Sequence, residues 1–434
     1  MNIRRSVAAL SLCAALGAAA APAAVADDGQ AGRAEGLYGA KDPKFDGVWR
    51  QSLALLAQDA VGVTPAKSAV DWLAGQGCAD GGFAAYRADT SKACDPKKGE
   101  FTDATAAAVQ ALAAVGGRSG TVEKGIGWLK RHQNEDGGWG MNPGGPSDAN
   151  STAAAIGAFA ATGQDPAKVT SASGKGTAGK GASGKGGKTP YDALLGLQLD
   201  CSAKAEERGA FAYTAAKGKP VANELATASA ALAARGKGFV FETVGKDGGA
   251  EPKPLPCEKG KDGADAPKDA AEAALAHLTR VMSDTGMHLK SAMPGAKDQP
   301  DFGGTADAVV ALAAGEHSAA AGKPLQWLQS KDSGTAAWAK GDPGALAKLI
   351  LAAHAAGADP RDFGGADLVQ QLNATGPKPE AAAPGAESDG NGKSEEKKDD
   401  DGGGVGGVWW TVGVCAVAGM GIGFLLSGRK RRRL

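Results

Sequence analysis

The stretch "WLKRHQNEDGGWG" spans residues 128–140, and "WLAGQGCADGGFA" spans residues 72–84. Both run from a Trp-Leu pair through a polar turn to Asp-Gly-Gly and an aromatic ring, in the same register. Glycine adopts positive φ without a steric penalty, so Asp-Gly-Gly predicts a sharp turn after a helix. The aromatic ring would then pack on the next part of the chain. The recurrence indicates that the protein is built of repeats.

Looser copies of this pattern begin at Leu194 and Trp327, and alanine-rich segments lie between the copies. The small side chains of these segments predict inner helices that approach one another closely, while the bulkier Trp-Leu segments suit an outer layer. Asp or Asn at a helix start caps the first backbone N–H groups. We expect such caps in four of the five alanine-rich segments, which start at Asp103, Asn150, Asn223, Gly303 and Asp342.

Helix periodicity and start signals together predict twelve helices. Thr64-Pro65, Asp165-Pro166 and Asp359-Pro360 each place a capping residue before a proline, which favours a helix start. Twelve helices make six inner–outer pairs, enough to close a two-layer ring. The predicted fold class is therefore all-α. The helices are expected to centre near residues 54, 70, 109, 128, 155, 194, 229, 276, 310, 327, 350 and 367.

Residues 124–139, "KGIGWLKRHQNEDGGW", resemble the QW motif of the prenyltransferase and squalene-cyclase repeat family. Residues 67–83 form a looser copy that ends at Phe83. The resemblance implies an α/α toroid with a central apolar cavity over most of residues 47–375. In that family the glutamine amide stacks on the aromatic ring and bonds a neighbouring helix end. The resemblance therefore implies a structural, stapling role for Trp72, Trp128, Gln133 and Trp139.

The two ends of the chain predict export and membrane attachment. Residues 1–26 have a basic start, an apolar centre and the small-x-small site Ala24-Val25-Ala26, which is the layout of a signal peptide. Residues 408–427 carry no charge and are long enough to span a bilayer. The basic tail at residues 428–434 then places the C-terminus in the cytoplasm. We expect a single-pass protein of the bacterial cell membrane.

The expected body at residues 36–375 is joined to the membrane segment by a polar stretch. Residues 376–404 consist mainly of Pro, Ala, Gly, Glu, Lys and Asp, a composition that predicts a disordered tether. Two polar inserts, residues 168–188 and 246–268, interrupt the repeats, and the first carries lysines without acids. The formal net charge of zero favours neither nucleic acid nor an acidic polymer as a partner.

Four cysteines fall within the expected body: Cys78, Cys94, Cys201 and Cys257. An even number in an exported domain favours disulfides, and four cysteines allow three pairings. Pairs of Cys78 with Cys94 and Cys201 with Cys257 are favoured because each brackets one connection between helices. A metal site made of all four thiolates is the alternative.

The family motifs for catalysis are incomplete in this chain. Residues 103–107 read "DATAA", so Asp103 matches the acid of the oxidosqualene cyclase motif Asp-Cys-Thr-Ala-Glu, but Ala104 and Ala107 replace its cysteine and glutamate. A lone aspartate at a helix start is favoured as the anion rather than as an acid. Asp103 is therefore only a weak catalytic candidate. The zinc ligands of the protein prenyltransferases have no counterpart, so neither a metal nor a cofactor is expected.

The sequence thus favours a binding protein over an enzyme. The ligand would be a small apolar or amphipathic molecule, or a partner protein, held at the mouth of the ring where inner helices start. The alternative is a terpenoid cyclase, a prenyltransferase-like enzyme or a lyase with unfamiliar catalytic residues. Aromatic walls with a few polar groups are typical of ligand pockets. The expected contacts are Phe83, Tyr86, Trp139, Phe211, Tyr213, Trp338, Asn150 and Asp342.

Overall fold

The computed structural model describes residues 35–95, 99–172, 187–215, 220–242, 249–258, 262–292 and 298–381. The expected signal peptide (1–26), membrane segment (408–427) and basic tail (428–434) lie outside the described residues. So do most of the expected tether (376–404) and most of the lysine-rich insert (168–188). No helix within the described ranges combines the length and the apolar character needed to cross a membrane.

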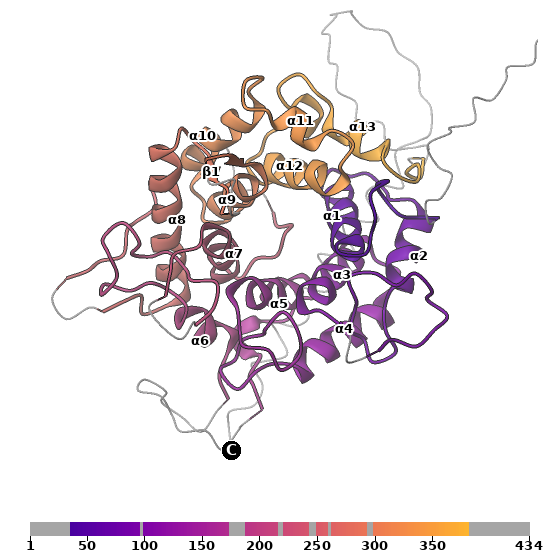
Figure 1. Ribbon diagram of the computed structural model, residues 1–434, viewed down its shortest axis with the longest axis horizontal. Coiled ribbons are helices and arrows are strands. Elements are labelled where there is room, and N and C mark those ends of the chain that lie inside the picture. The colour runs from indigo at the N-terminus through magenta and orange to yellow at the C-terminus, as the bar shows by residue number, and fades with distance from the viewer. Residues whose placement is uncertain are drawn as a thin grey trace, which may run out of the picture. The chain divides into compact units, whose positions relative to one another are not determined.

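The described residues are mainly helical, which confirms the all-α prediction (Figure 1). Every expected helix is present, and α11 is an additional short one. The strands β1 (Leu289–Lys290) and β2 (Pro300–Asp301) form one antiparallel ladder, with Leu289 opposite Asp301. The helices are α1 (Gly47–Ala60), α2 (Lys67–Gly75), α3 (Thr102–Val115), α4 (Ser119–Arg131), α5 (Ala149–Ala161), α6 (Pro190–Leu195), α7 (Glu224–Ala234), α8 (Pro267–Asp284), α9 (Phe302–Ala314), α10 (Ser318–Gln329), α11 (Thr335–Ala339), α12 (Pro343–Ala355) and α13 (Leu368–Asn373).

Six alanine-rich helices form a closed ring. In order around the ring they are α1, α3, α5, α7, α9 and α12; each packs on the next, and α12 packs on α1 (Figure 1). Their alanines are mostly fully buried, as in the run of residues 106–108 of α3. Small side chains let helix backbones approach closely, which explains why alanine dominates this layer.

The other helices lie outside this ring and pack on its members. Helix α2 contacts α1 and α3, α4 contacts α3 and α5, and α8 contacts α7 and α9. Helices α10 and α13 pack on α9 and α12, respectively. Two expected helix starts were wrong, because Asp165-Pro166 and Asp359-Pro360 begin only short 3-10 turns, Pro166–Lys168 and Pro360–Asp362. The outer helices α6 and α13 begin later, at Pro190 and Leu368.

Two of the four expected helix caps are correct. The side chains of Asn223 and Asp342 accept backbone N–H groups of α7 and α12. Asn150 lies instead within the first turn of α5, whose cap is Asp148. Asp103 likewise follows the cap position of α3, which Phe101 occupies without a side-chain cap bond. The cap positions expected at Asp103 and Asn150 were therefore each wrong by two residues, and neither side chain is needed to cap its helix.

A buried threonine joins each turn to the next inner helix. The Trp139 amide donates to the Thr152 hydroxyl at 3.0 Å, and the Phe83 amide donates to that of Thr105 at 2.9 Å. The amides of Phe211 and Leu289 make the same bond to Thr227 and Thr305, at 2.9 and 3.0 Å. All four threonines are fully buried. These bonds hold the chain after each turn against the following repeat.

The tryptophans and glutamines of the repeated pattern have structural roles. Trp128 is fully buried and donates to a Glu100 carboxylate oxygen at 2.7 Å. The Gln198 side-chain amide donates to the Ala270 carbonyl of α8 at 2.9 Å. Gln133 departs from that pattern, because its amide donates to Gly137 of its own turn at 2.8 Å.

Both favoured disulfide pairs are present. Cys78 is bonded to Cys94, with Cα atoms 5.7 Å apart, and Cys201 is bonded to Cys257, with Cα atoms 5.4 Å apart. The four-thiolate metal site is therefore excluded, because every one of its sulfurs is already bonded. Among the described residues, one group of three sits close enough to hold a metal, Cys78, Cys94 and Glu100, and two of its members form a disulfide.

Candidate functional site

All six inner helices begin at the same end of the ring, which we call the mouth. The Thr102 amide of α3 donates to the Met141 carbonyl at 2.9 Å, in the loop that leads to α5. The Ala149 amide of α5 donates to the Tyr213 carbonyl at 2.9 Å, in the loop that leads to α7. Each of these helix starts is thus bonded to the segment that leads to the next one.

The remaining helix starts meet in the same way. Leu225, in the first turn of α7, lies close to Gly304 in the first turn of α9. A Cβ atom added to Gly304 would be only 2.8 Å from the Leu225 Cδ2. Lys41, ahead of α1, pairs with Asp342, the cap of α12, at 2.7 Å. The expectation that the inner-helix starts gather at one mouth is confirmed by these contacts.

The ring encloses a cavity of about 240 Å³. Every inner helix contributes to its wall, so the cavity is the lumen of the ring. Its apolar part comes from aliphatic side chains and two aromatic rings, and Ser229 of α7 adds a half-buried hydroxyl. The larger apolar residues in the wall are Trp49, Leu53, Leu225, Leu232, Phe239, Val310 and Leu351.

The segment that follows α7 crosses the lumen, away from its own helix. The Phe239 amide donates to the Gln110 side-chain oxygen of α3 at 3.0 Å. The Phe239 ring meets that of Trp49 of α1 edge to face, with centroids 5.6 Å apart. Gly238 lies so close to Gln110 that a Cβ would be 2.5 Å from its oxygen. This segment therefore closes off part of the ring and limits the free volume.

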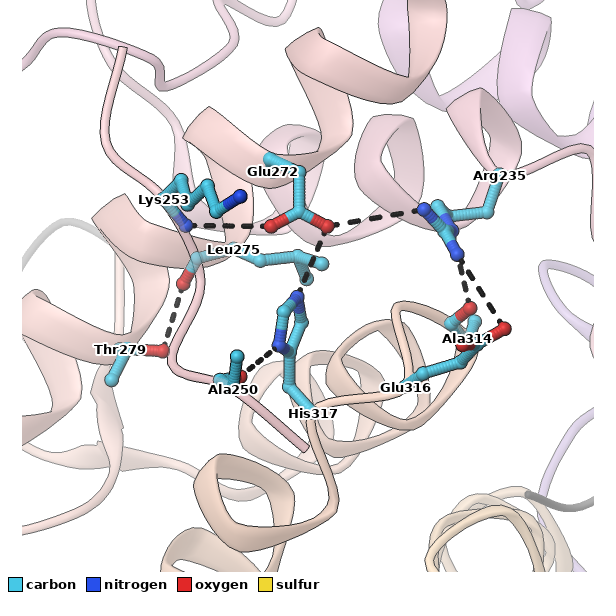
Figure 2. A network of polar contacts seen from close by, with 9 residues as sticks. All are labelled: Arg235, Ala250, Lys253, Glu272, Leu275, Thr279, Ala314, Glu316 and His317. Carbon is cyan, nitrogen blue, oxygen red and sulfur yellow. Dashed lines mark hydrogen bonds and ion pairs between the residues drawn. The ribbon is translucent and has the colours of Figure 1, made fainter. Parts of the chain in front are cut away.

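A polar network holds the chain further along the same connection (Figure 2). Each ring nitrogen of His317 faces an oxygen, that of the Ala250 carbonyl at 2.5 Å and that of Glu272 at 3.1 Å. Glu272 also accepts the Lys253 amide at 3.3 Å and lies 3.9 Å from Arg235 at the end of α7. The network fastens residues 250–253 to the outer side of α7, α8 and α9.

Two polar side chains at the mouth face the lumen from equivalent positions. Asp103 is the second residue of α3, and Asn150 is the second residue of α5. The Asn150 side-chain oxygen is buried and has no hydrogen-bond partner among the described residues. Burial raises the pKa of Asp103, and the nearby Asp148 carboxyl raises it further. The expectation that a helix start favours the Asp103 anion is thus opposed by desolvation, which the sequence did not reveal.

An ion pair spans the lumen wall on the other side. Lys348 of α12 and Asp307 of α9 lie 2.5 Å apart and are both partly exposed. Asp307 also raises the pKa of Asp301, the cap of α9, although burial of Asp301 is the larger cause. The positive charge of Lys348 is therefore already paired with a carboxylate of the neighbouring helix.

Most of the expected aromatic contacts lie away from the lumen. The rings of Phe83, Trp139 and Phe211 are fully buried between repeats. Tyr86 stacks on Trp72, with ring centroids 6.4 Å apart, and Trp338 stacks on Phe302 at 5.5 Å. None of these five rings lines the cavity.

The other three expected ligand contacts, Asn150, Asp342 and Tyr213, lie at the mouth. Asn150 lines the lumen, whereas Asp342 caps α12 and pairs with Lys41. Tyr213 is 41% exposed beside the start of α5. Its pKa is raised by burial and, to a lesser extent, by the negative charges of Asp148 and Asp103.

Sequence reasoning missed the residues that fill the middle of the site: Trp49, Phe239, Asp307 and Lys348. Asp307 and Lys348 did leave a signal, since each is a charge inside an alanine-rich apolar helix. Phe239 left none, because a phenylalanine in a connection does not indicate which surface it meets.

The mouth also carries the exposed large apolar side chains of the described chain. Phe45, Met141 and Val221 precede α1, α5 and α7, and Leu225 lies in the first turn of α7. Tyr213 completes the set. Scattered apolar residues are normal on a surface, but a group around a cavity entrance is typical of an interaction site.

Comparisons with known proteins give one structural similarity and no function. No protein-family model matches the sequence, and no curated protein matches it. Among solved structures, the chain is similar to one described as a crystal structure of a protein from Actinoplanes, with a TM-score of 0.44 and 15% sequence identity. The similarity covers 75% of this chain and 95% of that chain.

Proposed function

We propose that the protein is a binding protein that holds a small amphipathic molecule in the lumen of its helical ring. The observation that carries the proposal is the cavity itself, which has a largely apolar wall from all six inner helices and a few polar groups. Ligand pockets are generally mostly apolar with a few polar groups that orient the ligand. The apolar rim at the mouth supports entry from that side.

The size of the lumen favours a small ligand. Its volume of about 240 Å³ lies below the range of roughly 300–1,000 Å³ that is usual for pockets of drug-sized molecules. A long polyprenyl chain would have to displace the segment around Phe239. A short molecule fits without any rearrangement.

We further propose that the ring is an α/α toroid of the QW repeat type, exported and anchored in the cell membrane. The closed order of the inner helices and the stapling of Trp128 and Trp139 support the repeat assignment. The two disulfides support export, since such bonds persist in oxidising compartments. The uncharged stretch at residues 408–427 supports the anchor.

An enzyme is the second candidate, and one observation favours it. A proton donor needs a carboxylic acid whose pKa is raised, and burial raises that of Asp103. Asp103 faces the lumen, as a cyclase acid would. Its carboxylate, however, accepts the adjacent Ala104 amide at 2.8 Å, which stabilises the anion instead. Binding therefore remains the better supported function.

The test of binding uses two substitutions at one position in the wall. In Ser229→Trp a large ring fills the lumen, whereas Ser229→Ala leaves the lumen open and serves as the matched control. Calorimetric titration of the full chain in lipid nanodiscs with n-hexanol should show saturable binding to the parent and to Ser229→Ala. The same titration of Ser229→Trp should show only the uptake by lipid.

Equal titration curves for all three proteins would reject the lumen as the binding site. The enzyme candidate is tested separately by incubation with squalene and chromatography of the products. Products that form with the parent and not with Asp103→Asn would replace the binding function with a cyclase.

A further inference from the structure

The lumen presents an acid without a cation. Among the described residues, Asp103 forms no ion pair, and Lys348 is held by Asp307 at 2.5 Å. Lys237 also borders the cavity, but it follows the C-terminal end of α7, whereas Asp103 lies in the first turn of α3 at the mouth. Asp103 is partly buried and accepts the Ala104 amide at 2.8 Å. A partly buried carboxylate is costly unless charges or hydrogen-bond donors compensate it, and a cationic ligand would add to the single donor that Ala104 supplies.

The neighbouring helix presents a hydrogen-bond acceptor without a donor. The Asn150 oxygen is buried and unpartnered, at the position of α5 that corresponds to Asp103 of α3. These two helices pack directly on each other. Two adjacent acceptors match a group with several N–H donors, and an ammonium group offers three.

An aromatic residue, Tyr213, lies at the same mouth. The Tyr213 carbonyl accepts the Ala149 amide at 2.9 Å, next to the Asp148 cap, and the Tyr213 ring is partly exposed. An aromatic face attracts a cation through its quadrupole. Phe45 and Met141 add exposed apolar surface around this mouth for the rest of the ligand.

An anionic ligand fits this mouth less well. Helix N-termini do attract anions. Here, however, the side chains of Asp148, Asp301 and Asp342 already cap α5, α9 and α12. A further negative charge would meet these carboxylates and Asp103.

We propose that the ligand is a primary alkylamine, whose ammonium group binds between Asp103 and Asn150 while its apolar body occupies the lumen. The inference rests on the proposed binding function and deepens it, because it gives the chemical class of the ligand.

The experiment compares three probes with the same carbon chain: n-hexylammonium, n-hexanol and hexanoate. Calorimetric titration of the full chain in nanodiscs of zwitterionic lipid, at pH 7, should rank n-hexylammonium first and hexanoate last. Asp103→Asn should weaken n-hexylammonium by about tenfold or more, since hydrogen bonds to charged groups are the strong ones. It should leave n-hexanol binding within a factor of two or so of the parent.

Asp342→Asn is the matched control. Asp342 is an acid at the same mouth that caps a helix without lining the lumen, and asparagine caps a helix nearly as well. This variant should keep the preference for n-hexylammonium. Thermal unfolding of both variants shows that each is folded.

The outcomes separate the inference from the function on which it rests. If n-hexanol binds and Ser229→Trp abolishes that binding, the lumen is a binding site. If, in the same protein, hexanoate binds as tightly as n-hexylammonium, or Asp103→Asn leaves n-hexylammonium unaffected, the amine inference is wrong and the binding function stands. If none of the three probes binds, both are wrong.

Discussion

At the scale of single residues, the repeats depend on a hydroxyl rather than on the aromatic ring alone. Thr105, Thr152, Thr227 and Thr305 each occupy the fourth position of an inner helix and accept the amide that follows a turn. A buried N–H without a partner is costly, so each hydroxyl stabilises the contact between two repeats.

We expect Thr152→Val to lower the free energy of unfolding by about 1–3 kcal/mol, because valine has a similar shape but leaves the Trp139 amide unpaired. Thr162→Val is the control at the other end of α5. The Thr162 hydroxyl donates to carbonyls of its own helix and accepts the Gln164 side-chain amide just beyond it, so it joins no other repeat and its loss should cost less than about 0.5 kcal/mol. Chemical denaturation of both variants makes the comparison, and equal losses would contradict the role of Thr152.

The buried His277 predicts a pH dependence of stability. Burial in α8 lowers its pKa to about 4, and Arg280 one turn away contributes to this shift. Between pH 6.5 and 4 the unfolded chain therefore binds a proton that the folded protein resists. Stability from this residue is full above about pH 6.5 and falls as the pH drops towards 4.

From pH 7 to pH 5, the loss due to His277 should be about 2 kcal/mol of unfolding free energy. His277→Gln cannot titrate in this range and should lose correspondingly less over the same interval. Denaturation curves of the parent and the variant at both pH values provide the measurement. Parallel losses in the two proteins would show that His277 does not resist protonation.

At the scale of elements, the segment after α7 has the most direct influence on the site. It reaches Gln110 of α3, which is 129 residues away in the sequence, and Trp49 of α1. Because Phe239 lines the lumen and is partly buried, its ring occupies space that a ligand could otherwise use.

Phe239→Ala should therefore both destabilise the fold and enlarge the lumen. We expect a loss of about 2 kcal/mol, less than for a fully buried phenylalanine. The variant should bind n-decanol, which the parent lumen is too small to enclose. Phe45→Ala is the control, since Phe45 is 90% exposed, and it should change neither property. If Phe239→Ala and the parent show the same preference for n-hexanol over n-decanol, Phe239 does not limit the size of the lumen.

At the scale of the whole ring, the first and last helices of the described body close it. The Gly39 amide donates to the Thr375 carbonyl at 2.9 Å, and the Gln58 amide of α1 donates to Asn373 of α13 at 2.7 Å. The two ends of this body therefore meet, and the ring does not depend on where the chain starts.

A circular permutant of this body should fold. A short linker would join residue 377 to residue 36, and the new chain ends would lie within residues 173–186. The residues on either side of that range are held together, because the Ser171 amide donates to the Lys188 carbonyl at 2.9 Å. Circular dichroism should show the parent's helix content and a melting point within a few degrees of it. A second permutant, with its new ends between Ala155 and Ile156 of α5, should not fold. If both permutants fold, or if neither folds, the meeting of the two chain ends does not explain which permutant is stable.

The local parts of this structure could be predicted from the sequence. Helix positions follow from the spacing of apolar residues and from caps such as Asn223 and Asp342, because these interactions involve residues a few positions apart. The disulfide partners Cys78 and Cys94 could be predicted because they bracket a single turn. The resemblance to the QW motif implied structural roles for Trp128 and Trp139, and both rings are fully buried.

The lumen, in contrast, was decided by tertiary structure. Asp307 and Lys348 are 41 residues apart and form a pair only because α9 and α12 are neighbours in the ring. The raised pKa of Asp103 depends on burial by several helices, which no local pattern encodes. The sequence alone determined that this chain forms paired helices, because short-range hydrogen bonding and packing suffice for that. Only the closed ring decided which side chains share a cavity, because it brings distant helices together and removes the water between them.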